Sequence, residues 1–191
     1  RTSLEAAVRR NVMGGLGLMQ ERISRQNHDD LGCDGWEISA HMASAPDHEP
    51  FQGRQFSDAA YEKLNASLVR RIGTLNCGHL ASPIILGVNA PQYTREELEK
   101  FRKDNQNGID YNGRHYTMYE ATQRQRQLER AIRKQKRRIL MAEQNPDDPK
   151  RLQNARIRYQ VLNQEYRRFS NAAGLRLQHE RMEMTGFGPK Q

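Results

Sequence analysis

Histidine and cysteine side chains in two segments are the residues whose types suit metal binding. His41 and His48 lie seven positions apart, and Cys77 and His79 form a Cys-x-His motif. Zinc favours four nitrogen or sulfur ligands in a tetrahedron, and these four side chains can supply them. The His-x6-His spacing differs from that of well-attested zinc fingers. The candidate zinc site therefore rests on residue types rather than on a known spacing.

The same residues could instead catalyse a reaction. His41 and His48 could act as general acid and base on a phosphodiester, with Arg54 or a lysine stabilising the developing negative charge. Cys77 could be a nucleophile that His79 or His48 activates, since alternate residues of a strand point to one face. A third interpretation is structural, in which these side chains satisfy backbone donors and hold a loop in shape. The sequence leaves metal binding, catalysis and loop structure open.

Positive charge is concentrated in the last third of the chain. Residues 1–113 contain 13 Lys/Arg and 15 Asp/Glu, whereas residues 114–181 contain 17 and 7. The stretch 117–138 has only two acids, Glu120 and Glu129, so repulsion among its cations is largely uncompensated. This asymmetry predicts a polyanionic partner, and we expect non-specific binding to the backbone of double-stranded DNA. The candidate nucleic-acid-binding residues are Arg130, Arg133, Lys134, Lys136, Arg137 and Arg138, of which about four could reach phosphates at once.

Composition excludes a membrane protein and a disulfide scaffold. The 191 residues carry a net charge of +8, and only 36% are hydrophobic. No run approaches the ~18 consecutive apolar residues that a spanning helix needs. The two cysteines fit a reducing compartment, as free thiols or metal ligands.

Short elements must position the histidines and the cysteine. We expect a helix over 3–26, capped by Ser3 and carrying a kink, a break or a close packing contact at Gly14, Gly15 and Gly17. Turn residues follow at 27–32, and an irregular loop extends over 41–57. The remaining predicted elements are a strand at 36–40, a helix at 58–71, a buried strand at 83–88, a helix at 94–104 with a Thr94/Glu97 capping box, and a hairpin around Asn112-Gly113.

Two long helices are predicted in the basic part, over 117–144 and 150–173, with a break at 145–149. In the second helix, apolar residues step by three and four positions in an unbroken heptad stripe. The two helices should therefore form an antiparallel hairpin in which this stripe is buried. The stripe comprises Leu152, Ala155, Tyr159, Leu162, Tyr166, Phe169 and Ala173, and the first helix offers Ala121, Leu128, Ile132 and Ile139.

The fold class predicted from these elements is α+β. A small helix-rich body with a short sheet and the His/Cys-rich loop should occupy 1–113. The basic helical hairpin and a C-terminal tail should occupy 114–191.

Several motifs in this order resemble the phage minor capsid protein 2 family. They are Glu37-Ile38-Ser39-Ala40-His41, Ala45-Pro46-Asp47-His48, Gln52-Gly53-Arg54-Gln55-Phe56-Ser57, Leu75-Asn76-Cys77-Gly78-His79 and the run Tyr111–Gln123 with Arg126 and Glu129–Arg133 after it. The resemblance covers nearly the whole chain. The family is in turn distantly similar to the Mu F-like head-morphogenesis domain.

The resemblance implies a structural protein of a tailed-phage head and the C-terminal portion of a longer minor capsid protein. It implies synthesis in the bacterial cytoplasm, a place in the head interior, and phage portal or capsid proteins as partners besides DNA. Some head-morphogenesis relatives carry toxin or nuclease domains. The alternative function is therefore a nuclease-like or other hydrolytic domain that uses His41, His48, Cys77 and His79.

Overall fold

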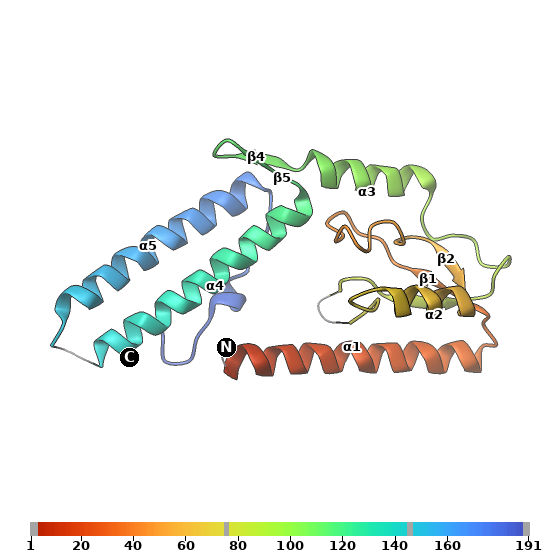
Figure 1. Ribbon diagram of the computed structural model, residues 1–191, viewed down its shortest axis with the longest axis horizontal. Coiled ribbons are helices and arrows are strands. Elements are labelled where there is room, and N and C mark those ends of the chain that lie inside the picture. The colour runs from red at the N-terminus through yellow and green to blue at the C-terminus, as the bar shows by residue number, and fades with distance from the viewer. Residues whose placement is uncertain (1–3, 75–76, 145–146, 189–191) are drawn as a thin grey trace. The chain divides into compact units, whose positions relative to one another are not determined.

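The computed structural model describes residues 4–74, 77–144 and 147–188, which include α-helices and short antiparallel strands (Figure 1). The α+β class predicted from the sequence is confirmed. The chain divides into two compact units, residues 1–105 and 106–191. Ser3, the predicted cap of the first helix, lies outside the described residues.

The first unit is built on a three-stranded antiparallel sheet of order β2-β1-β3. Its strands are β1 (Gly35–Ile38), β2 (Gln55–Ser57) and β3 (Ala81–Ile84). Helix α1 (Leu4–Asp30) contacts β3, and α2 (Asp58–Ser67) contacts β1 and β2. Trp36 of the central strand stacks between His28 and Tyr61, with ring centroids 4.8 Å and 5.2 Å away. The buried core comprises Trp36, Ile38, Tyr61, Leu64 and Ile72.

The strand expected at 83–88 begins two residues earlier, at Ala81, and ends at Ile84. Its pairing with β1 determines both ends. Ile38 pairs with Ala81 and Gly35 with Ile84. Beyond Ile84, side-chain oxygens of Asp34 and Asn89 accept from backbone N–H groups and fold residues 85–89 into a turn. The prediction of a buried strand over 83–88 was therefore wrong for residues 85–88.

Helix α1 extends through the residues that were predicted to form a turn. It ends only at Asp30, and Gly32 follows with φ of +61°. A left-handed glycine just after a helix is a frequent stop signal, so the chain reverses there rather than at Asn27. Helix α2 is shorter than predicted and ends at Ser67, while α3 (Arg95–Asn107) runs three residues further.

The glycines of α1 do not interrupt the helix. A Cβ at Gly17 would lie 2.7 Å from the carbonyl oxygen of Gly73, whereas Gly14 and Gly15 have open space around them. Of the three outcomes expected from the sequence, the structure shows a close packing contact. The partner of Gly17 is the backbone of a loop.

Alanine at Gly14 and at Gly17 should have opposite effects on stability. Gly14→Ala should raise the free energy of unfolding by about 0.5–1 kcal/mol, because alanine favours the helix and the position is open. Gly17→Ala should lower it, because the backbone oxygen of Gly73 cannot move aside as a side-chain tip can. Urea denaturation followed by circular dichroism measures both, and a stabilising Gly17→Ala would contradict the packing contact.

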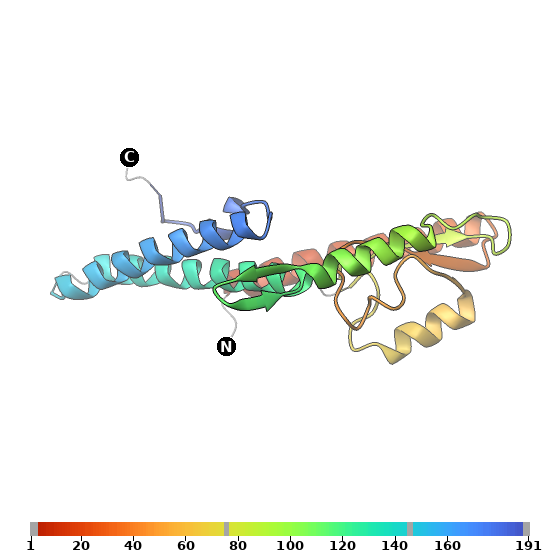
Figure 2. The same cartoon turned by 90° about the horizontal axis from the view of Figure 1, so that it is seen from above.

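The second unit is a helical hairpin preceded by a short β-hairpin. Strands β4 (Ile109–Tyr111) and β5 (Arg114–Tyr116) join through Asn112 and Gly113, which have φ of +51° and +76°. Helix α4 (Met118–Glu143) begins at a capping box between Thr117 and Glu120. Helix α5 (Pro149–Ala172) runs beside α4 (Figure 2), and the 3-10 helix η1 (His179–Met182) contacts α4.

The core of this unit confirms most of the heptad stripe. Tyr166 and Phe169 are fully buried, and the edges of the Tyr111 and Tyr116 rings pack against Phe169. Leu152, Tyr159 and Leu162 are only half-buried, so the prediction that the stripe would be buried was wrong for these three. The buried core comprises Ala121, Leu128, Ile132, Tyr166, Phe169, Ala173 and Met182.

Truncation of the stripe should destabilise the second unit according to burial. Phe169→Ala should cost about 3–5 kcal/mol, because it empties a fully enclosed site. Leu162→Ala should cost about 2 kcal/mol or less, because water already reaches part of that side chain. Equal losses in thermal or urea unfolding would show that α4 and α5 do not pack in this register.

Candidate metal centre and nucleic-acid interface

Three of the four predicted metal ligands converge in the first unit. The ligand atoms of His48, Cys77 and His79 all lie within 4.8 Å of one another. The Sγ atom of Cys77 is 3.2 Å from Nδ1 of His48 and 3.3 Å from Nδ1 of His79. Sulfur and nitrogen ligands of a tetrahedral zinc are roughly 3.5 Å apart, given bonds of ~2.3 Å and ~2.0–2.1 Å. The three side chains therefore fit around one zinc ion with small adjustments.

Hydrogen bonds on the far side of each imidazole ring direct Nδ1 towards the thiol. Nε2 of His48 lies 3.0 Å from the carbonyl oxygen of Arg70, which can only accept, so this nitrogen carries the proton. Nε2 of His79 lies 3.3 Å from Oε1 of Gln52 and 3.3 Å from the hydroxyl of Ser44. Metal-binding histidines commonly donate their second N–H to such an oxygen, which fixes the tautomer and the ring orientation.

Burial keeps the His79 ring neutral. His48 and His79 are 1% and 2% exposed. Burial, together with charge repulsion from His41 and His48, lowers the pKa of His79 to about 4. A neutral imidazole is the form that binds a metal ion.

His41 lies beside the other three residues but outside their group. Its ring packs against that of His79 with centroids 4.3 Å apart. Its Nε2 atom is buried and has no hydrogen-bond partner among the described residues. Gly78 leaves room for this ring, since a Cβ there would lie 3.1 Å from Nε2. A rotation of the His41 ring could therefore bring a fourth ligand to a metal held by the other three.

The arginine considered for catalysis has other contacts. Arg54 is exposed, donates to the carbonyl oxygen of Pro50, and lies 5.7 Å from the centre of the Phe56 ring. The Cys-x-His motif lies in a loop before β3 rather than in a strand. The geometry thus brings His48 and His79 to the thiol of Cys77 and leaves Arg54 at the surface.

Sequence reasoning assigned no role to Gln52, Ser44 or the carbonyl group of Arg70. Oε1 of Gln52 accepts from the backbone N–H of His41 and also contacts His79. Gln52 follows His48 by four residues in a polar loop, which gives no signal of its own. Only the folded loops show that Gln52 and Ser44 orient the candidate ligands.

The six candidate nucleic-acid-binding residues of α4 divide into two groups. Arg130, Lys134 and Arg138 are exposed, at intervals of four residues, so they form one row along the helix. Arg133, Lys136 and Arg137 are half-buried.

Two of the half-buried cations bind the C-terminal segment. Arg133 donates to the carbonyl oxygen of Arg181, and Nζ of Lys136 lies 2.7 Å from that of Met182. Lys136 also sits 4.9 Å from the centre of the Phe187 ring. Burial lowers the pKa of Lys136, and Glu183 opposes that shift. These contacts hold the residues after α5 against α4.

Comparison with known proteins identifies the class of this chain as phage structural proteins. The family model described as Phage minor capsid protein 2 matches residues 1–171. The chain therefore belongs to this family, as its motifs predicted, and membership points to the phage particle as its location and to phage structural proteins as its partners. No curated protein and no solved structure gives a significant match. Among the described residues, no helix is long and apolar enough to cross a membrane.

Zinc content and stability should fall together when the candidate site loses its thiolate. The purified chain should carry about one zinc ion, and Cys77→Ser should lower both the metal content and the melting temperature, because binding is coupled to folding. Elemental analysis and thermal unfolding with and without a chelator provide the measurements.

Cys33→Ser is the matched control, because Cys33 is also a free thiol and lies outside the cluster. It should keep the zinc and respond to the chelator as the wild-type chain does. If the wild-type chain contains no zinc and Cys77→Ser is as stable as the wild type, the zinc site is refuted.

Proposed function

We propose that this minor capsid protein contacts double-stranded DNA in the phage head, without regard to sequence, through the basic helices of its second unit. The observation that carries the proposal is the exposed row of Arg130, Lys134 and Arg138 on α4. Successive members are about 6 Å apart along the helix axis. Among the described residues, none of the three has a carboxylate oxygen within 4.0 Å, so their charges are open to an external anion.

Packing of the hairpin supports this role for the row. Leu128, Ile132 and Ile139 face the core, which leaves the side of α4 that carries the row to solvent. Phosphate contacts of this kind fix position along a duplex but read no bases. The surface should therefore bind any duplex with a strong dependence on salt.

The His/Cys cluster is better suited to structure than to hydrolysis. Its two innermost rings are almost fully buried, and a buried ring cannot reach a phosphodiester in a duplex. We infer that His48, Cys77 and His79, with His41 beside them, hold a structural zinc ion in the first unit. The alternative of a nuclease-like domain would need this cluster to open.

Salt dependence of DNA binding tests the proposal. With three contacts from the row, the logarithm of the affinity for a 24-bp duplex should fall against the logarithm of salt concentration with a slope of about −2.7 or steeper. Arg130→Gln with Lys134→Gln should reduce the size of this slope by about 1.8, because two contacts are lost. Fluorescence anisotropy of a labelled duplex gives the slope for each protein.

Lys63→Gln with Lys100→Gln is the matched control, since it removes two exposed lysines from the first unit. It should leave the slope unchanged if the row is the contact surface. Absence of duplex binding by the wild-type chain at 50 mM salt would refute DNA as the partner. The acidic surface of another head protein, such as the portal, would then be the partner to test.

A further inference from the structure

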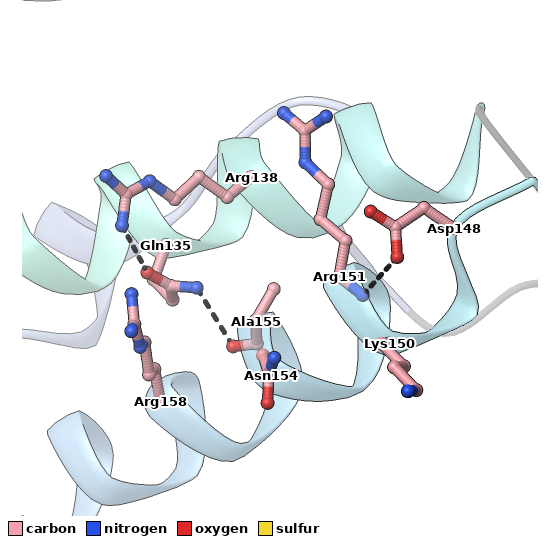
Figure 3. Close-up of a pocket in the computed structure, with 8 residues that line it drawn as sticks. All are labelled: Gln135, Arg138, Asp148, Lys150, Arg151, Asn154, Ala155 and Arg158. Atoms are coloured by element: carbon pink, nitrogen blue, oxygen red, sulfur yellow. Dashed lines mark hydrogen bonds between the residues drawn. The ribbon is translucent and has the colours of Figure 1, made fainter.

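A basic pocket lies between α4 and α5, where the C-terminal half of α4 faces the first turns of α5 (Figure 3). Its volume is about 490 Å³. Arg138 enters from α4, and Lys150, Arg151 and Arg158 come from α5. These residues are 12 or more positions apart in the sequence across the turn, so only the paired helices bring them together.

The charges around this pocket are unbalanced. Among the described residues that line it, Asp148 is the one acid, and its carboxylate accepts from the backbone N–H of Arg151 at 3.0 Å, as the cap of α5. Among the described residues, none of the four cations has a carboxylate oxygen within 4.0 Å. Four positive charges therefore repel one another across the pocket. The carboxylate of Asp148 already caps α5 and does not neutralise them.

Gln135 forms the floor and fixes the arrangement. It is 4% exposed, and its amide donates to the carbonyl oxygen of Ala155 at 3.0 Å across the two helices. Its Oε1 accepts from Arg138 at 3.4 Å. Arg138 and Arg158 extend on either side of Gln135 in Figure 3. Ala155, with a single methyl group, leaves the space between them open.

We propose that this pocket binds phosphate groups, with Arg138, Arg151 and Arg158 as the ligating side chains. The planar guanidinium group presents paired donors that match phosphate oxygens, and a phosphate dianion relieves the repulsion among the three arginines. The phosphate comes either from the DNA backbone or from a free phosphate compound. Binding of a DNA phosphate rests on the proposed function, because the exposed row on α4 ends at Arg138, where a bound DNA strand would reach the pocket.

Arg151 and Arg158 are the residues to change. Both are exposed and neither is in the core, so neutral variants should fold normally. The pocket variant is Arg151→Gln with Arg158→Gln in the full chain. The matched control is Arg167→Gln with Arg168→Gln, which removes the same charge from exposed positions of α5 outside the pocket. Circular dichroism confirms that each variant is folded.

Two probes separate the sources of phosphate. Isothermal titration with inorganic pyrophosphate should show an affinity about tenfold weaker in the pocket variant and nearly unchanged in the control, because charged hydrogen bonds are lost only in the former. Anisotropy with the 24-bp duplex should show a salt slope smaller by about 1.8 in the pocket variant. Arg158→Lys should retain part of the pyrophosphate binding, because it keeps the charge without the paired donors.

Each outcome decides one of the two proposals. If the wild-type chain binds the duplex and the pocket variant behaves as the control with both probes, the pocket is refuted and DNA contact through the row stands. If the duplex does not bind but the pocket variant alone loses pyrophosphate, DNA contact is refuted and the pocket takes a free phosphate compound. If no variant binds either probe more weakly than the control does, the phosphate pocket is refuted.

Discussion

Two long loops of the first unit meet at the thiol of Cys77, which faces a nitrogen of His48 and a nitrogen of His79. One loop connects β1 to β2 and the other connects α2 to β3. The sheet itself is small, with strands of three or four residues, and among the described residues the buried cluster against it comprises Trp36, Ile38, Tyr61, Leu64 and Ile72. So small a core contributes limited stability. The polar cluster that joins the two loops therefore contributes a large part of the stability of their folded conformation. Hydrogen bonds of the two rings to Gln52, Ser44 and the carbonyl oxygen of Arg70 orient the rings for this contact.

In the second unit, the packing of aromatic rings decides where the charges point. Phe169 is enclosed by Tyr111, Tyr116 and the facing residues of α4, which fixes the rotation of each helix about its own axis. Once Ile132 faces inward, Arg130 and Lys134 must face outward, and Arg133 must turn to the side that the C-terminal segment covers. The basic surface is thus a consequence of apolar packing.

Local signals in the sequence predicted the helices and the β-hairpin, but not the ends of α1, α2 and α3. The predicted Thr94/Glu97 capping box forms at the start of α3, and Asn112-Gly113 supplies the positive φ angles of a tight turn. The extent of β3 depends on its register with β1, which no local pattern encodes. The His/Cys grouping could be inferred from residue types, but the departure of His41 from it depends on loop conformation. The basic pocket requires the relative register of α4 and α5, so its arginines on α5 could not be connected with Arg138 in advance.

The family match stops at residue 171, whereas the core of the second unit does not. Ala173 and Met182 are buried in it, Leu175 and Leu177 pack against it, and the hydroxyl of Tyr166 accepts from the backbone N–H of Gln178. In this chain, the segment after residue 171 therefore covers α4 and completes the core of the second unit. Any replacement for this segment would have to preserve its apolar contacts with the core and the carbonyl groups that Arg133 and Lys136 bind.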